Sequence, residues 1–231
     1  MKEIGAGLID VIKLLFSFDP ELMEVIGLTL SISGLSVLLS TLAGVPFGVL
    51  LGVNNFPGKG IVVRIIYTFM SLPPVIAGLT VFLILMRRGP LGSLQLNFTP
   101  AAMVIAQVCL VLPIVIGLTY NMVKEKAPTV YSLGLTLGGN RFSNLCLLIF
   151  EARVGLITAV VSGFGRAISE VGAVLIVGGN IKGKTRVMTT YITELKSMGD
   201  YTKAIAIGIV LLLLSFLVNA VLYHMQERMK R

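Results

Sequence analysis

The sequence predicts an all-α membrane protein with about five transmembrane helices. Hydrophobic residues make up 55% of the chain and charged residues only 13%, whereas soluble domains are about a quarter charged. The mean hydropathy is +0.94, and the apolar residues stand in long unbroken runs. A helix needs roughly 20 apolar residues to cross about 30 Å of hydrocarbon. Because no water is present there to bond backbone groups, runs of this length must be helical.

The charge balance does not indicate a soluble function. The 231 residues carry a net charge of +8, but basic residues between membrane spans ordinarily face phospholipid headgroups. No basic stripe is interleaved with aromatic residues, so we expect membrane lipid as a partner and no nucleic acid. Cys109 and Cys146 do not form a disulfide framework pattern. The sequence has no metal-ligand cluster and no nucleophile beside a base, so we expect no metal, no cofactor and no catalysis on this chain.

The first half of the chain is expected to contain three spans. Residues 1–21 form a short amphipathic segment at the membrane interface, and Pro20 after Asp19 is a typical helix start. Pro73 and Pro74 lie inside the second span and should kink it. The three spans cover residues 22–53, 61–86 and 101–123.

The second half begins with the longest polar interruption, residues 124–152, which we interpret as a helix–turn–helix outside the hydrocarbon. Gly138-Gly139-Asn140 is expected to stop its first helix. Asp200 should cap the last span, and residues 225–231 form a basic tail. The membrane domain therefore extends over residues 22–224, with spans four and five at 154–177 and 201–223.

The distribution of basic residues does not orient the chain. Five spans place the termini on opposite sides, and each side carries nine lysines and arginines, so the positive-inside rule gives a tie. One basic cluster, in the loop after the fourth span, could attract an anionic substrate. It consists of Lys182, Lys184 and Arg186.

Residues 178–185 match the phosphate-binding loop pattern G-x-x-x-x-G-K-T. In such a loop the backbone amides hold phosphates and Lys184 reaches the terminal phosphate. However, the preceding apolar run is long enough to be a membrane span, and no alternating strand–helix series is present to form a parallel sheet. We therefore interpret the segment as a glycine-rich helix end followed by a basic loop, while an NTP-hydrolysing enzyme remains an alternative hypothesis.

Arg166 and Glu170 are the charged pair within the fourth span, four residues apart and hence on one helix face. A charge at mid-bilayer costs at least about 2.5–3.5 kcal/mol, so such groups pair with each other or line a polar path. With Ser169 they are candidates for a translocation pathway or gate. A structural ion pair that fixes helix packing explains them equally well.

The helix–turn–helix at 128–150 has the shape of a docking surface for a soluble partner, although an amphipathic connector resting on lipid would look similar. Its sequence, SLGLTLGGNRFSNLCLLIFEARVGLITAV at 132–160, resembles the cytoplasmic coupling loop of ABC importer permeases. Two features depart from the usual family pattern: Ser132 in place of glutamate, and Ile149-Phe150 in place of Leu-Pro. The resemblance implies ATPase coupling through Leu133, Leu137, Gly138, Gly139, Asn140, Arg141 and Phe142.

Three further segments, at 71–92, 99–119 and 166–185, resemble permeases for tungstate, and next those for molybdate and sulfate. This resemblance implies the MetI-like fold and a homodimer in a prokaryotic cell membrane. It also implies two ATPase subunits that carry ATP and Mg²⁺, and an extracytoplasmic oxyanion-binding protein. The N-terminus would lie outside and the C-terminus in the cytoplasm. A self-sufficient channel or ion-coupled carrier remains the alternative from another class, supported by Arg166 and Glu170.

Overall fold

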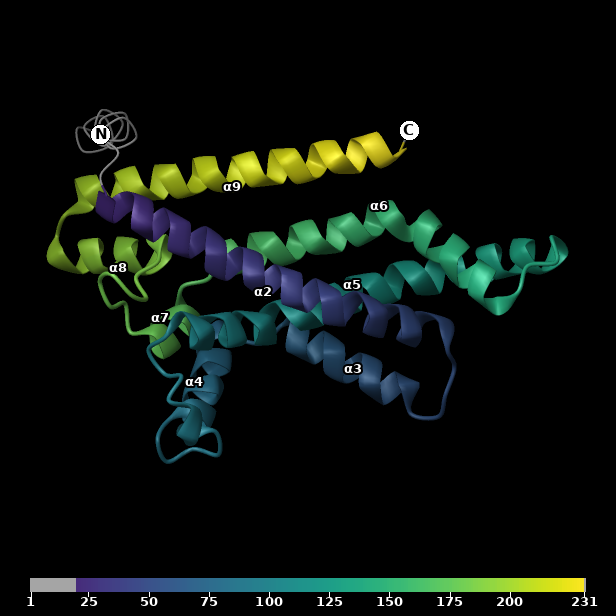
Figure 1. Ribbon diagram of the computed structural model, residues 1–231, viewed down its shortest axis with the longest axis horizontal. Helices are drawn as coiled ribbons and strands as arrows, with labels where there is room; N and C mark the ends of the chain where they lie inside the picture. The colour runs from purple at the N-terminus through teal and green to yellow at the C-terminus, as the bar shows by residue number, and fades with distance from the viewer. Residues whose placement is uncertain (1–19, 231) are drawn as a thin grey trace.

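The computed structural model describes residues 20–230, and the predicted interfacial segment lies almost entirely outside this range. Within it the chain is helical and contains no strand. The elements are α2 (Pro20–Val53), α3 (Lys59–Met70), α4 (Pro74–Leu85), η1 (Gly92–Leu94), α5 (Pro100–Thr136), α6 (Arg141–Ile168), α7 (Gly172–Gly178), α8 (Met188–Met198) and α9 (Tyr201–Lys230) (Figure 1). Four of them are long and apolar enough to cross a membrane, or five spans if the bent pair α3–α4 counts as one. The predicted class is confirmed.

The long helices α2, α5, α6 and α9 run lengthwise through the molecule (Figure 1). One end, here called the hairpin end, holds the α5–α6 connection, the α2–α3 turn and the last turns of α9. The opposite end, called the loop end, holds the first turn of α2 and residues 179–200. Asp200 caps α9 as predicted, since its carboxylate accepts a hydrogen bond from the backbone N–H of Lys203 at 3.1 Å.

The second predicted span is not a single kinked helix. It consists of α3 and α4, whose axes differ by 101° across residues 71–73. Two consecutive prolines remove two N–H donors and exclude the preceding residue from helical geometry. Pro73 is accordingly extended (ψ 131°) and caps α4, while Pro74 takes its first position. Pro113 and Pro128, by contrast, both lie inside the unbroken helix α5.

The most extensive helix–helix contact in the bundle is between α2 and α5. Gly44, Gly48 and Gly52 recur every fourth residue on α2, and a Cβ atom at each would lie only 2.3–3.0 Å from a side chain of α5. Small residues at this spacing let membrane helices approach closely, where lipid offers no hydrophobic driving force for association. This stripe went unrecognised in the sequence.

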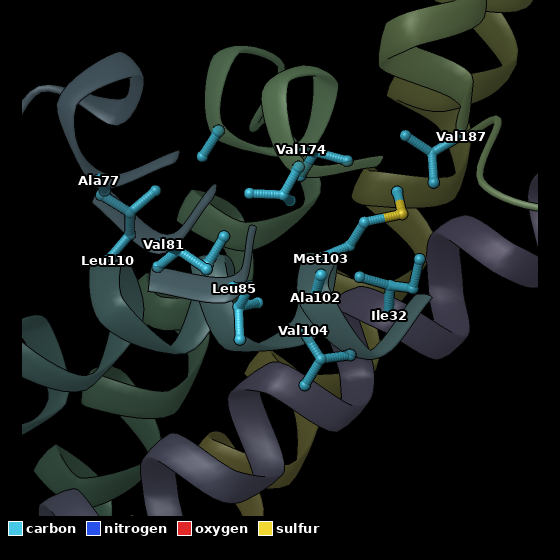
Figure 2. Close-up of a cluster of buried hydrophobic side chains, with 13 residues drawn as sticks. Ile32, Ala77, Val81, Leu85, Ala102, Met103, Val104, Leu110, Val174 and Val187 are labelled. Atoms are coloured by element: carbon cyan, nitrogen blue, oxygen red, sulfur yellow. The ribbon is translucent and has the colours of Figure 1, made fainter. Parts of the chain in front are cut away.

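The fourth predicted span also ends earlier than expected. It stops at Ile168 instead of Val177, and the remaining apolar residues form the separate helix α7. Figure 2 shows why α7 is fixed: Val174 from α7 meets Val81 from α4, Met103 from α5 and Ile32 from α2 in one buried cluster. The break at 169–171 is therefore held in place by packing on both sides.

Candidate functional site

The hairpin end carries the first candidate site, the α5–α6 hairpin. The polar residues after 123 do not interrupt the third span, because α5 continues through them to Thr136 and α6 begins at Arg141. The predicted helix–turn–helix thus exists, but its two arms are the ends of membrane helices and not separate short ones. The hairpin projects beyond the rest of the bundle (Figure 1).

The tip of the hairpin is a glycine-terminated helix end. Gly138 has φ +74°, a left-handed conformation that is costly for residues with a Cβ. The N–H of Gly139 donates to the carbonyl of Gly134 at 2.8 Å and that of Gly138 to Leu135 at 3.1 Å, the two bonds of a Schellman motif. Asn140 then caps α6 by accepting from the N–H of Ser143 at 2.8 Å. The predicted stop signal is confirmed.

Large apolar side chains are exposed on this tip. Leu137 is 83% exposed and Phe142 73% exposed, and Leu133 and Leu135 are each more than half exposed. Exposed apolar patches on this scale mark sites of interaction. All seven predicted coupling residues gather here: Leu133, Leu137, Gly138, Gly139, Asn140, Arg141 and Phe142.

Asn144, which the sequence reasoning missed, supports the hairpin from inside. It is buried on α6, and a Cβ at Gly134 would lie 1.9 Å from its side-chain oxygen. Gly134 and Gly139 therefore leave the space that lets Asn144 sit between the two arms. The spacing of these glycines around the turn was the available signal in the sequence.

The second candidate site is the helix break at 169–171, between α6 and α7. Arg166 lies in the last turn of α6, and Glu170 follows the end of that helix instead of sharing it. Their side chains are nevertheless paired, with Nη2 and Oε2 3.9 Å apart. Glu170 is 6% exposed, whereas the Arg166 side chain is 35% exposed. Ser169 is exposed beside them, its hydroxyl donating to the carbonyl of Gly165 at 2.8 Å.

The polar groups freed by this break are bonded within the protein, as a chain in hydrocarbon requires. The other carboxylate oxygen of Glu170 accepts from the N–H of Ala173 at 3.1 Å. Gln107 on α5 donates to the carbonyl of Ala167 at 3.0 Å, and Thr189 donates to that of Glu170 at 2.9 Å. Gln107 and Thr189 were missed because the sequence does not show which carbonyl a polar side chain will bond.

The third candidate, the basic cluster at the loop end, proves to be largely paired. Lys182 and Arg186 both contact the carboxylate of Glu21, at 2.8 and 3.0 Å, and Arg186 also contacts Glu194 at 2.8 Å. Lys184 is exposed next to them. The positive charge available to attract an anion is therefore smaller than the sequence count suggests.

The same loop contains the match to a phosphate-binding loop. It follows the seven-residue helix α7 and not a strand. The buried hydroxyl of Thr185 donates to the carbonyl of Gly178 at 2.6 Å and accepts from the N–H of Ile181 at 2.9 Å. The backbone N–H groups of residues 184–186 all donate to the carbonyl of Ile181. Amides that would have to hold a phosphate are thus engaged in closing the loop on itself.

A helical bundle with a projecting apolar hairpin and a broken membrane helix has the architecture of a transport protein's membrane component. Residues 44–231 match the family described as the inner membrane component of binding-protein-dependent transport systems. The match covers most of the chain, and the protein belongs to this family.

Relatives with assigned substrates are similar over nearly the whole length. A tungstate uptake system permease protein of Peptoclostridium acidaminophilum is 47% identical, covering 98% of this chain and all of its own. A second tungstate uptake permease protein, from Campylobacter jejuni, is 34% identical over 93% of this chain and 90% of its own. A molybdenum transport system permease protein of Azotobacter vinelandii is 29% identical over 87% and 92%.

Proposed function

We propose that this chain is the permease subunit of an ATP-driven importer for a tetrahedral oxyanion, and that the oxyanion is tungstate. The observation that carries the proposal is the α5–α6 hairpin, which projects from the bundle and exposes Leu137 and Phe142 at its tip. The substrate follows from the relatives: identity is 47% to a tungstate permease and 29% to a molybdenum permease, each over most of both chains.

Two copies of a separate ATPase, which bind ATP and Mg²⁺, dock on the hairpin. The anchors are Leu137 and Phe142, because large apolar groups at the centre of an interface supply most of its binding energy. Gly138 and Gly139 set the angle between the two arms. Arg141, exposed at the start of α6, adds a charge that can select an acidic partner surface.

The hairpin end faces the cytoplasm in this proposal, so the C-terminus is cytoplasmic and the N-terminus lies outside a prokaryotic cell membrane. Two copies of the chain form the homodimer that a symmetric pair of ATPases requires. An extracytoplasmic binding protein delivers the anion at the loop end, where Lys184 remains exposed beside the paired Lys182 and Arg186.

Arg166, Ser169 and Glu170 line the translocation pathway at the helix break. Arg166 and Ser169 present polar groups at the surface, at the end of α6. The buried carboxylate of Glu170 pairs with the Arg166 guanidinium. ATP-driven movement of the hairpin would shift α6, and with it the arginine, between two positions of an alternating-access cycle.

The experiment is reconstitution of the permease with the ATPase and the binding protein, followed by measurement of labelled tungstate uptake. We expect uptake that needs both partners and ATP and that exceeds uptake of molybdate and sulfate at equal concentration. Preference for molybdate or sulfate would change the assigned substrate. Substrate movement in liposomes that contain the permease alone would instead support a channel or carrier.

A further inference from the structure

Two adjoining cavities lie at the hairpin end, and neither is lined by Arg166, Ser169 or Glu170. The larger, of about 890 Å³, lies between the second half of α2 and the hairpin, and its walls are mainly apolar. They include Val45, Val49, Leu50, Leu145 and Ile149. The smaller, of about 420 Å³, lies between the α2–α3 turn and α5.

The two cavities are continuous in their walls, since Val53, Asn55 and Tyr131 line both. Their chemistry differs. The smaller one is lined by Lys59 and Lys124, and among the described residues that line it none carries a carboxylate. A mainly apolar cavity, which has Arg141 among its lining residues, therefore adjoins a cationic one.

The two lysines are held close to one aromatic ring. The Nζ atoms of Lys59 and Lys124 lie 5.5 and 5.8 Å from the centre of the Tyr120 ring, within the range of cation–π attraction. Lys59 also donates to the backbone carbonyl of Asn54 at 2.8 Å and to the side chain of Asn55 at 3.2 Å. These acceptors are neutral, so they position the Lys59 ammonium group without cancelling its charge. The resulting field favours an anion between the two lysines.

The place of the cavities in the fold indicates which anion. They flank the last turn of α2 and the first residue of α3, where the chain leaves one apolar span and enters the next. Basic residues at this level face phospholipid headgroups, and anionic lipids concentrate near them. A free phosphate would use the cationic cavity alone, whereas a lipid has an acyl chain for the apolar one.

We propose that this site binds one anionic phospholipid, with its phosphate between Lys59 and Lys124 and an acyl chain along Leu50 and Ile149. The lipid would fill the space between α2 and the hairpin. It would thereby brace the hairpin against the membrane domain. This inference does not depend on which oxyanion is transported, because it concerns a different surface of the chain.

The test is native mass spectrometry of the purified full-length permease titrated with phosphatidylglycerol or phosphatidylcholine. We expect phosphatidylglycerol to be retained in preference by at least about tenfold. The double variant Lys59→Gln/Lys124→Gln should lose about 30-fold in affinity, because each basic residue near an anionic lipid contributes about fivefold. Arg64→Gln/Arg228→Gln is the matched control, since it removes two charges at the same end outside both cavities.

A second pair of variants tests the apolar half. Ile149→Glu places a carboxylate in the larger cavity, while Leu147→Glu places one at a similarly exposed position of α6 outside it, the two residues being 41% and 38% exposed. Ile149→Glu should lower lipid retention at least tenfold and Leu147→Glu should not. A melting curve of each variant in phosphatidylcholine shows whether it is folded.

Several results would overturn the proposal. Equal retention of the two lipids, or equal retention of phosphatidylglycerol by wild type and the double lysine variant, would exclude an anionic lipid. Displacement of phosphatidylglycerol by inorganic phosphate at equal concentration would identify a free-anion site. Lipid retained by monomers and absent from dimers would mean that a second copy of the chain occupies the cavity. If the lysine variant does not fold, the wild-type lipid preference and the glutamate pair decide the question.

Discussion

The two ends of the molecule differ in whether their candidate functional groups are paired within the chain or exposed. At the loop end, Glu21 and Glu194 engage Lys182 and Arg186, and Thr185 bonds within its own loop. At the hairpin end, Leu137 and Phe142 remain in solvent on a rigid, well-capped turn. The charged groups at the loop end are thus largely paired within one chain, while the hairpin end exposes apolar groups for the proposed partner. The difference teaches that charged residues which suggest a binding site in the sequence can instead stabilise the fold. Apolar residues without any reactive group can form the exposed surface.

The largest effect is expected where the hairpin is disrupted. Replacing both Leu137 and Phe142 with aspartate should reduce co-purification of the ATPase by more than 100-fold, since each apolar anchor contributes about 2 kcal/mol. The free energy of unfolding should change little, because surface substitutions usually cost less than about 0.5 kcal/mol. The control is Leu94→Asp, an exposed leucine in η1. If the double variant co-purifies with the ATPase as well as wild type does, the hairpin end is not the surface that binds the ATPase.

The next effect is on stability at the loop end. Arg186 is only 11% exposed and pairs with two carboxylates, so Arg186→Gln removes the arginine that pairs with Glu194, whereas Glu21 keeps Lys182. Unpaired, partly buried charges are costly, and we expect a loss of about 2 kcal/mol in unfolding free energy. Thermal unfolding in detergent measures it. ATPase co-purification should not change, and if it does, the ends are not independent.

A smaller effect, on transport, is expected at the helix break between α6 and α7. Glu170→Gln keeps an oxygen that can accept from Ala173 but removes the charge opposite Arg166. Tungstate uptake should fall about tenfold, which corresponds to about 1.4 kcal/mol, with a nearly normal melting temperature. Ser162→Ala, elsewhere on α6, is the control. Wild-type uptake together with reduced yield would assign the pair to packing instead of the pathway.

The smallest effect concerns the exposed ion pair. Lys182 is 66% exposed although it lies 2.8 Å from Glu21, and exposed pairs contribute about 0–1 kcal/mol. Lys182→Gln should therefore destabilise the protein by less than 1 kcal/mol, and added salt should narrow the difference from wild type. A loss of unfolding free energy as large as that caused by Arg186→Gln would show that solvent exposure does not determine how much each ion pair contributes to stability.

Local chemistry made some features predictable from the sequence. Gly138 and Asn140 predicted the turn of the hairpin because a left-handed glycine and an N-cap are set by neighbouring residues. The predictions for spans two and four were wrong in detail. Prolines separate α3 from α4, whereas other prolines lie inside the continuous helix α5. The apolar run continues to Val177, so the sequence does not show that α6 ends at Ile168. The pairing of Glu21 with Lys182 could not be predicted, because it joins residues 161 positions apart.

The continuity of α6 has a mechanical consequence. This one helix of 28 residues begins at the hairpin tip and ends beside Glu170, a path of about 42 Å at a rise of ~1.5 Å per residue. It contains no proline and is one continuous helix, bent partway along in Figure 1, so we expect movement at the tip to be passed to its far end. A tilt of about 5° applied at the tip displaces the far end by about 3.7 Å over that length, nearly the full 3.9 Å that separates Arg166 from Glu170.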